Sequence, residues 1–345
     1  MSEFSWPDLL GRLSRRLDIT REQARSAMAA IMGGEATPAQ IAALIVSLRM
    51  KGETVEEMTG LVQAMRSAAV SADLGTDEAV DIVGTGGDRS GTFNISTTAS
   101  FIAAGAGVAI AKHGNRSMSS KCGSADVLEG LGVVIDLPVD KTEQLFRDTG
   151  YAFFFAPMYH PAMRFAGPVR RELGIPTVFN FLGPLSNPAG TRNYAIGVAD
   201  GLMAERMIRV LSALGAERAF VFYGADGLDE LTLSGRSTIW RLVGGEISHA
   251  QFTPEDFGVS PAPISEVLGG LVEENVAITR SILEGEKGPR RDIAVINAAA
   301  GIMASGGVDD VAEGTVLAAE AIDSGAASQV LESVISRSQQ LTEES

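Results

Sequence analysis

The apolar run and glycine cluster AVDIVGTGGD, residues 79–88, lie where the chain changes from purely helical patterns to strands that alternate with helices. The β-branched run bounded by glycine predicts a buried strand over residues 79–83, and a helix is predicted near residues 97–106. Glycines after such a strand let backbone N–H groups approach an anion closely. The cluster lacks both the Gly-Lys-Ser/Thr of a Walker A loop and the dinucleotide G-x-G-x-x-G spacing. Taken alone, it equally suits an ordinary tight turn between a strand and a helix.

The same alternation continues toward the C-terminus. Strands alternating with helices predict an α/β unit with a largely parallel central sheet flanked by helices. Further strands are predicted at residues 108–111, 151–155, 194–198 and 219–223, a β-hairpin at residues 238–247, and helices at residues 125–131, 203–214, 265–283, 293–304, 311–323 and 327–341.

Upstream of residue 79 the chain shows only helical signals. A threonine followed three residues later by glutamine or glutamate forms a capping box, which predicts helix starts at Thr20, Thr37 and Thr54. Such short helices bury little by themselves, so we expect a small all-helical N-terminal domain, residues 1–73, packed on a larger α/β domain, residues 74–345, or on a second copy of itself. An earlier helix is predicted from the apolar face Leu9, Leu10, Leu13 and Leu17.

The composition excludes several classes of protein. The chain has 345 residues, and 28 basic against 43 acidic residues give a formal charge of −15, which argues against a general nucleic-acid binder. Its single cysteine, Cys122, rules out an intramolecular disulfide, and with three histidines it makes a structural zinc site a poor expectation. We find neither a signal peptide nor a membrane span, and expect a cytoplasmic protein.

The segment NIST, residues 94–97, offers an amide and two hydroxyls at the predicted start of the helix after the glycine cluster. Backbone N–H groups and the helix dipole favour anions there. An ordinary helix cap is the alternative for this segment alone. Together with the glycine cluster it indicates a phosphate cradle.

The segment KHGNRSMSSKCGS, residues 112–124, follows the next predicted strand and therefore lies at the same edge of the sheet. Its cations and serines suit a second phosphate group. The alternative is a solvated loop, although the segment contains no acidic residue in a strongly acidic chain. A lone histidine such as His113 is more often packed than catalytic. Cys122 is better explained as a small buried residue than as a nucleophile, because nothing in the sequence supplies its base.

The segment DGLDE, residues 226–230, places adjacent carboxylates after a predicted strand, which is what Mg²⁺ requires to bridge protein and pyrophosphate. An acidic surface turn is the alternative, and is favoured for this motif alone. The loop-rich segment 156–188 contains the pair Arg170-Arg171, which can bind a carboxylate or simply form surface salt bridges.

Several motifs in this order resemble the anthranilate phosphoribosyltransferase family: GTGGD, NIST, KHGNRS, SSKCGSAD, PVRRELG, FNFLGPLSNP and DGLDE, which span residues 84–230. The resemblance implies that a crossing segment near residues 162–177 joins the small helical domain, and that a homodimer forms through the small domains. It also implies Mg²⁺ as cofactor, two ions per active site, and phosphoribosyl pyrophosphate (PRPP) and anthranilate as substrates. Met163 stands where some relatives carry an aromatic residue in the anthranilate channel.

The resemblance further implies a set of site residues. Anthranilate is expected at Gly84, His113, Asn115 and Arg170, and the metal at Ser96, Asp229 and Glu230. PRPP is expected at Gly84, Gly87, Asp88, Thr92, Asn94, Ile95, Ser96, Thr97, Lys112, His113, Gly114, Asn115, Arg116, Ser117, Met118, Ser119, Ser120 and Ser124.

The expected chemistry needs no covalent nucleophile and no strong general base, since an aromatic amine is already neutral at pH 7. Positioning and electrostatic stabilisation of the departing pyrophosphate should dominate. The sequence leaves two alternatives. One is a pyrimidine nucleoside phosphorylase of similar fold, and the other is a non-catalytic, nucleic-acid-binding paralogue, which the charge of −15 opposes.

Overall fold

The N-terminal helices begin at the capping boxes that the sequence predicts. The computed structural model describes residues 4–117 and 121–344. The side chains of Thr20, Thr37 and Thr54 each accept a hydrogen bond from the backbone N–H three residues later, and the side chain of that later residue accepts one from the threonine N–H. The expectation for Leu17 is wrong: the first helix ends at residue 13, and Leu17 is 44% exposed. The helices are α1 (Trp6–Leu13), α2 (Arg21–Met32), α3 (Pro38–Lys51) and α4 (Val55–Ser67).

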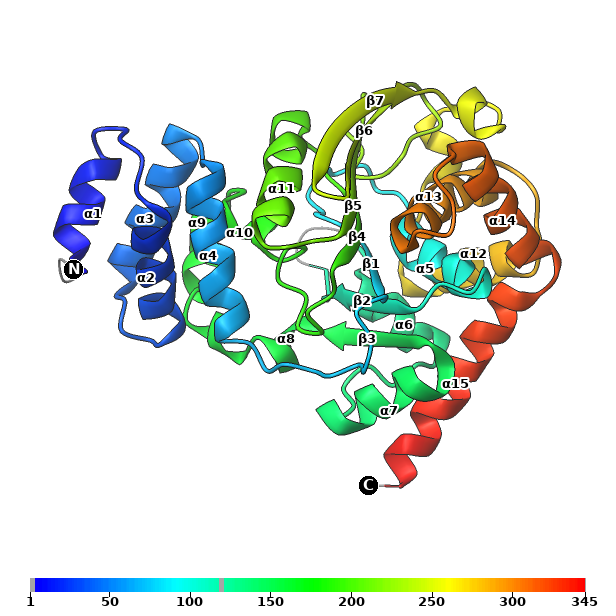
Figure 1. The fold of residues 1–345 in the computed structure, drawn as a ribbon. Helices are drawn as coiled ribbons and strands as arrows, with labels where there is room; N and C mark the ends of the chain where they lie inside the picture. Colours follow the sequence, from blue (N-terminus) through cyan, green and yellow to red (C-terminus); the bar gives the residue numbers. More distant parts are fainter. Residues whose placement is uncertain (1–3, 118–120, 345) are drawn as a thin grey trace.

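Within the described residues a seven-stranded sheet has the order β3-β2-β1-β4-β5-β6-β7 (Figure 1). The pairs from β3 through β5 are parallel, whereas β6 and β7 form an antiparallel hairpin at one edge. Gly244 and Gly245 both have positive φ, as the tight hairpin turn requires. The largely parallel α/β architecture is confirmed. The strands are β1 (Val80–Gly84), β2 (Ile110–Gly114), β3 (Tyr151–Phe155), β4 (Asn193–Gly197), β5 (Arg218–Gly224), β6 (Ser237–Val243) and β7 (Glu246–Phe252).

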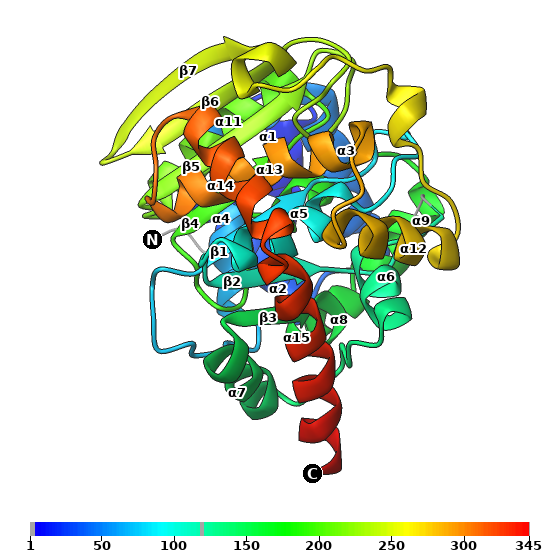
Figure 2. The ribbon, with the colours of Figure 1, turned by 90° about the vertical axis from the view of Figure 1, so that its right-hand side faces the viewer.

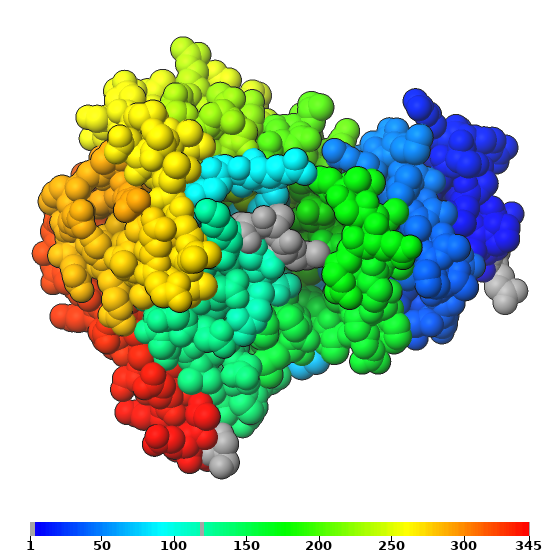
Figure 3. Space-filling view, turned by 180° about the vertical axis from the view of Figure 1, so that it is seen from behind, coloured from blue at the N-terminus to red at the C-terminus, as the bar shows by residue number. Residues whose placement is uncertain are grey.

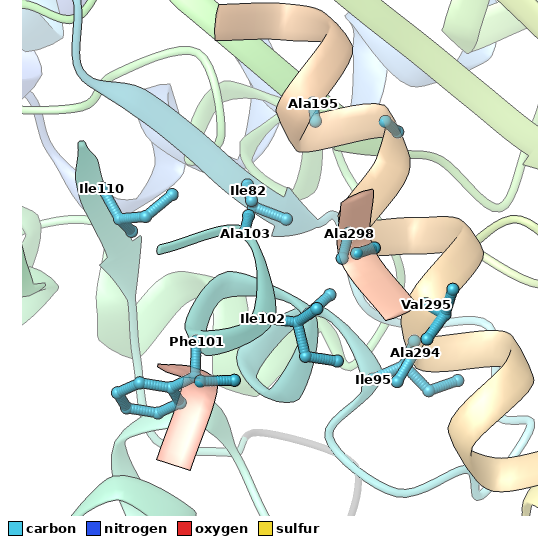
Figure 4. Close-up of a cluster of buried hydrophobic side chains, with 14 of the residues drawn as sticks. Ile82, Ile95, Phe101, Ile102, Ala103, Ile110, Ala195, Ala294, Val295 and Ala298 are labelled. Atoms are coloured by element: carbon cyan, nitrogen blue, oxygen red, sulfur yellow. The ribbon is translucent and has the colours of Figure 1, made fainter. Parts of the chain in front are cut away.

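The central strands are buried on both faces, because alternate side chains enter different hydrophobic clusters. Phe220 and Phe222 of β5 lie in the cluster with α5 (Ile95–Gly105) and α13 (Pro289–Ser305). Figure 4 shows side chains of β1, α5 and α13 meeting in this cluster. Val221 lies in the opposite cluster, with α11 (Gly201–Ala213) and the N-terminal helices. The sheet therefore separates the helices α5 and α13 on one face from α11 and the N-terminal helices on the other.

The remaining predicted helices mostly match their ranges. The helix predicted from residue 265 starts only at Val272, since Gly269-Gly270 interrupt it. Neither α7 (Val139–Thr149) nor the short helices between residues 156 and 182 were predicted. The long helix α15 runs alongside α7 toward the C-terminus (Figure 2). The other elements are α6 (Ser124–Leu131), α7 (Val139–Thr149), η2 (Pro254–Phe257), η3 (Ile264–Val267), α12 (Val272–Leu283), α14 (Val311–Asp323) and α15 (Ala326–Glu343).

After β3 the chain returns to the N-terminal bundle. Ala166, Val169 and Val178 share one buried cluster with residues of α1 to α4, and α9 contacts α3. Figure 1 shows α9 and α10 beside α4. The segment consists of α8 (Ala156–Tyr159), η1 (Pro161–Arg164), α9 (Gly167–Leu173) and α10 (Phe179–Leu182).

The strand order reverses next to β1. The chain runs from β1 to β2 and β3 on one side, and then places β4 on the other side. Gly84 and Gly197, the last residues of β1 and β4, are paired in the sheet. In open α/β sheets ligands bind outside the carboxyl ends of the strands at such a reversal. No helix among the described residues has the length and apolar composition needed to cross a membrane.

Candidate active site

Asp229 and Glu230 lie at this reversal, in the loop after β5, with only 8% and 7% of their surfaces exposed. Asp229 Oδ2 accepts a hydrogen bond from Gly86 N at 2.6 Å, and Glu230 Oε1 accepts one from Ser96 N at 3.1 Å. The two carboxylates thus join the glycine cluster to the start of α5. The expected metal residues Ser96, Asp229 and Glu230 come together, and Asp229-Glu230 is no acidic surface turn.

Glycine is required where β1 and β4 end. A methyl group on Gly84 would overlap Asp229 Oδ2, and one on Gly197 would overlap the Asp229 carbonyl. Real Cβ atoms do not make such approaches, so the loop carrying Asp229 could not lie there above any other residue. The same close packing lets Thr85 N donate to Gly197 O at 2.9 Å.

The carboxylates crowd one another in a buried site. Burial, and then the negative charge of Asp88, raise the pKa of Asp229 to about 7. Burial, and then the charge of Asp229, raise the pKa of Glu230 well above its usual range. Such a site favours a cation, because neutralising the pair relieves both costs.

The donor set suits Mg²⁺ bound together with a substrate. Within residues 4–117 and 121–344, no group of three or more His, Cys, Asp and Glu side chains is arranged to hold a metal by itself. Mg²⁺ is commonly held by one or two carboxylates plus substrate phosphates, and it prefers oxygen ligands. Asp229, Glu230 and the Ser96 hydroxyl fit that arrangement.

The glycine cluster forms an open turn above the strand end. Gly86, Gly87 and Gly91 have positive φ, and a Cβ on any of them would meet nothing within 4 Å. Asp88 Oδ1 accepts from Ser90 N at 3.2 Å, while its Oδ2 is buried without a partner among the described residues. The turn therefore presents backbone groups rather than side chains.

The start of α5 is not an ordinary capped helix, since Asn94 makes no side-chain capping bond. Its Nδ2 donates instead to Cys122 O at 3.2 Å, which ties α5 to the loop after β2. Ile95 is 1% exposed in the core and Thr97 is fully buried. For these two expected PRPP residues, only the backbone is available to a ligand.

Lys112 lies inside β2 rather than in a loop, and only 1% of it is exposed. Its Nζ donates to Ile82 O at 2.5 Å and to Ser96 Oγ at 3.4 Å. Burial lowers the pKa of Lys112 to about 8, against the opposing charges of Asp81 and Glu230. The strand therefore holds the ammonium group beside the Ser96 hydroxyl, and contact between Lys112 and PRPP stays a prediction.

His113 is also buried in β2, as the packed interpretation has it. Its ring centre lies 5.1 Å from that of His160, and the Nε2 atoms of both rings are buried without a partner among the described residues. Burial, and then the charge of His160, lower the pKa of His113 to about 3. The ring is therefore neutral at physiological pH.

The loop after β2 folds back on α6. Arg116 pairs with Asp126 at 2.9 Å and Glu129 at 2.8 Å, so the acidic partners that the segment itself lacks come from the next helix. Ser124 Oγ accepts from Asn115 N at 3.2 Å, beside Gly114 at the strand end. Ser117 N donates to Asp126 Oδ2 at 3.1 Å. The expected residues Met118, Ser119 and Ser120 lie outside the described residues.

Cys122 shows no sign of being activated. It is 6% exposed, and burial raises the pKa of its thiol to about 11. The reactive form of cysteine is the thiolate, which is scarce at that pKa. This supports the expectation that Cys122 is not a nucleophile.

Arg170 lies in α9, within the crossing segment, and Figure 3 shows this green part of the chain between the blue N-terminal helices and the cyan and teal part of the α/β domain. The guanidinium is half-buried, 5.2 Å from the centre of the Phe179 ring, and burial lowers its pKa. Met163, in η1, packs against the cluster of the N-terminal helices.

Sequence reasoning missed a buried support behind β2. Asn187 Nδ2 donates to Asp81 Oδ2 at 2.8 Å and to Ala111 O at 2.7 Å, and Asp81 Oδ1 accepts from His113 N at 3.1 Å. Burial raises the pKa of Asp81 to about 6. The available signal was an aspartate within an apolar strand, which only a partner can stabilise.

Comparisons with known proteins agree with this geometry. Residues 76–328 match the model described as "Glycosyl transferase family, a/b domain", and residues 7–69 match "Glycosyl transferase family, helical bundle domain". An anthranilate phosphoribosyltransferase of Herpetosiphon aurantiacus is 51% identical over 335 residues, which are 96% of this chain and 98% of that protein.

Solved structures agree as well. The anthranilate phosphoribosyltransferase of Thermus thermophilus has a TM-score of 0.91 and 41% identity, over 96% of this chain and 99% of that one. That of Saccharomyces cerevisiae in complex with PRPP and Mg has a TM-score of 0.88 and 27% identity, over 98% and 99% of the two chains.

Proposed function

The chain belongs to the anthranilate phosphoribosyltransferase family, and on that basis we propose how its residues divide between two substrates. The enzyme transfers phosphoribose from PRPP to the amine of anthranilate in a Mg²⁺-dependent reaction of tryptophan biosynthesis. The products are N-(5-phosphoribosyl)anthranilate and pyrophosphate. One observation supports the placement of PRPP and the metal: Asp229 accepts a hydrogen bond from the glycine cluster, and Glu230 accepts one from the start of α5.

PRPP lies, in this proposal, across the carboxyl ends of β1 and β2. The backbone of the glycine turn and the first turn of α5 donate N–H groups to its phosphates, where the helix dipole adds to their effect. Lys112 lies beside this start of α5, where its Nζ donates to the Ser96 hydroxyl. The proposed PRPP residues are Gly84, Gly87, Asp88, Thr92, Asn94, Ile95, Ser96, Thr97, Lys112, His113, Gly114, Asn115, Arg116, Ser117, Met118, Ser119, Ser120 and Ser124.

Ser96, Asp229 and Glu230 hold the metal, and the proposal includes two Mg²⁺ ions per active site. Bound there, Mg²⁺ neutralises pyrophosphate and makes it a better leaving group. The charge of Asp88 raises the pKa of Asp229, so a third carboxylate lies near Asp229 and Glu230. The burial of these groups keeps water away and strengthens their electrostatic effect.

Anthranilate enters, in this proposal, past Gly84, His113 and Asn115, with its carboxylate on Arg170. Its amine attacks C1 of the ribose from the face opposite pyrophosphate, which inverts that centre. His113 is uncharged, so it adds no repulsion to the positive charge that develops on the sugar. Positioning of the two substrates supplies most of the rate.

We also propose that the helical domain, residues 1–73 with the crossing segment 162–177, forms the contact of a homodimer, and that residues 74–345 form the catalytic domain. The shared cluster of α1 to α4 with Ala166 and Val169 supports this assignment of the crossing segment. A cytoplasmic location is part of the proposal. A stable monomer in light scattering at micromolar concentration would contradict the dimer.

The activity test mixes purified protein with PRPP, Mg²⁺ and anthranilate, and follows the loss of anthranilate fluorescence. We expect turnover that stops when any one of the three is omitted or when a chelator is in excess. Phosphorolysis of thymidine or uridine without turnover of anthranilate would instead support a nucleoside phosphorylase.

A further inference from the structure

Arg170 combines partial burial with the lack of an ion partner. Within the described part of the chain its guanidinium makes no ion pair and no hydrogen bond, and it lies over the Phe179 ring, 5.2 Å from the ring centre. Arg116, by contrast, is held by two carboxylates of α6. The Arg170 guanidinium therefore keeps its N–H donors available for a ligand.

The ring can hold the guanidinium without occupying those donors. An aromatic face attracts a cation through its quadrupole, whereas the N–H groups of a stacked guanidinium point outward in its own plane. Burial opposes the charge on Arg170, as its lowered pKa indicates, and the ring offsets part of that cost. Phe179 is 3% exposed and packed in the cluster of the N-terminal helices, so the ring itself is fixed.

We propose that Phe179 is a positioning residue for substrate selection: its ring holds the Arg170 guanidinium in plane for two-pronged binding of the anthranilate carboxylate. The inference rests on the proposed role of Arg170. A carboxylate at position 179 would also hold the arginine, but it would compete with the substrate for the same donors. A ring orients the cation and leaves it unpaired, so the enzyme favours an aromatic amine that carries a carboxylate.

The test compares Phe179→Leu with Phe181→Leu. Both residues are buried in α10 and in the same cluster, but Arg170 lies over Phe179. Kinetics are measured with anthranilate and with its uncharged amide, 2-aminobenzamide. We expect Phe179→Leu to raise the anthranilate KM about three- to tenfold, the range of a partly buried cation–π contact, and to lower the preference for anthranilate over the amide equally. kcat and the PRPP KM should change less than about twofold.

The double variant Arg170→Ala/Phe179→Leu shows whether Phe179 acts by positioning the Arg170 guanidinium or by stabilising the fold in general. We expect no further loss of anthranilate use beyond that of Arg170→Ala alone, because the ring acts through the arginine. Additive losses, an equal loss of PRPP use, or an equal effect of Phe181→Leu would overturn the proposal. If Phe179→Leu does not fold, Phe179→Met is measured in the same way.

The outcome also distinguishes this inference from the function on which it rests. If Arg170→Ala lowers anthranilate use but Phe179→Leu does not, only the role of Phe179 is wrong. If Arg170→Ala itself leaves anthranilate use unchanged, the site assignment is wrong and the role of Phe179 is lost with it.

Discussion

The two sides of the active site are built from different materials. The side proposed for PRPP consists of strand ends, a glycine turn and a helix start, with the carboxylates Asp229 and Glu230 buried among them. The side proposed for anthranilate consists of short helices after β3, a buried histidine pair and one half-buried arginine over a ring. A ligand with many charges needs donors fixed by the sheet, whereas a flat aromatic acid needs an apolar wall and one cation. We therefore expect substitutions on one side to alter the kinetic constants of one substrate and to leave those of the other nearly unchanged.

The largest effect is expected from removing the metal carboxylates. Asp229→Asn with Glu230→Gln should lower kcat/KM for PRPP on the order of a thousandfold or more, as loss of transition-state charge stabilisation does. The fold should persist, because burial costs the neutral amides less than the charged pair. Steady-state kinetics and circular dichroism measure both, with Glu255→Gln, an exposed acid in η2, as the charge control. Full turnover of the double variant, or of wild type in chelator, would remove the metal assignment.

Arg170→Ala tests the opposite side. It should weaken anthranilate use by about 1.5–3 kcal/mol, the range for a hydrogen bond to a charged group, or roughly ten- to a hundredfold in kcat/KM. The PRPP KM should hardly change, since within the described residues no hydrogen bond or ion pair joins the Arg170 guanidinium, which lies over Phe179, to a residue proposed for PRPP. Varying each substrate in turn decides the point. Equal damage to both constants would mean that Arg170 supports the fold or faces a phosphate.

Gly197→Ala should disturb the proposed PRPP side, although Gly197 is not itself one of the residues proposed to bind PRPP or the metal. A methyl group there would overlap the Asp229 carbonyl, so the metal loop must shift. Overpacking of this kind costs about 1–3 kcal/mol, which corresponds to roughly five- to a hundredfold in PRPP kcat/KM if it acts on the site. Gly235→Ala is the matched control, because nothing lies within 4 Å of its Cβ and its φ is not positive. A loss of anthranilate binding alone in Gly197→Ala would reverse the assignment of the two sides.

The smallest effect is expected at the link between the loops. Cys122→Ser should keep activity within about tenfold of wild type, because the thiol is buried and its pKa is raised to about 11. The bond from Asn94 uses the Cys122 carbonyl, which the substitution retains. Activity assays and thermal unfolding together measure this. A loss beyond about a hundredfold in a stably folded variant would point to a nucleophile after all.

Local patterns were predictable because they depend on residues a few positions apart. The capping boxes at Thr20, Thr37 and Thr54, the hairpin at Gly244-Gly245 and the strand before Gly84 all form as expected. The helix expected from residue 265 was wrong at its start, since two glycines outweighed an apolar pattern. The family resemblance placed the site motifs in order, but it said nothing of which side chains turn inward.

The amino-acid sequence alone determined the class of fold, the edge of the sheet at which the motif residues meet, and the residue types available there. Only the tertiary structure decided that Lys112 points beneath the site, that Arg116 pairs with α6, and that Arg170 rests on Phe179. The physical reason is that each of these contacts joins segments whose neighbourhood depends on strand order and helix packing. A periodic pattern shows which face of an element is buried, but not what lies against it.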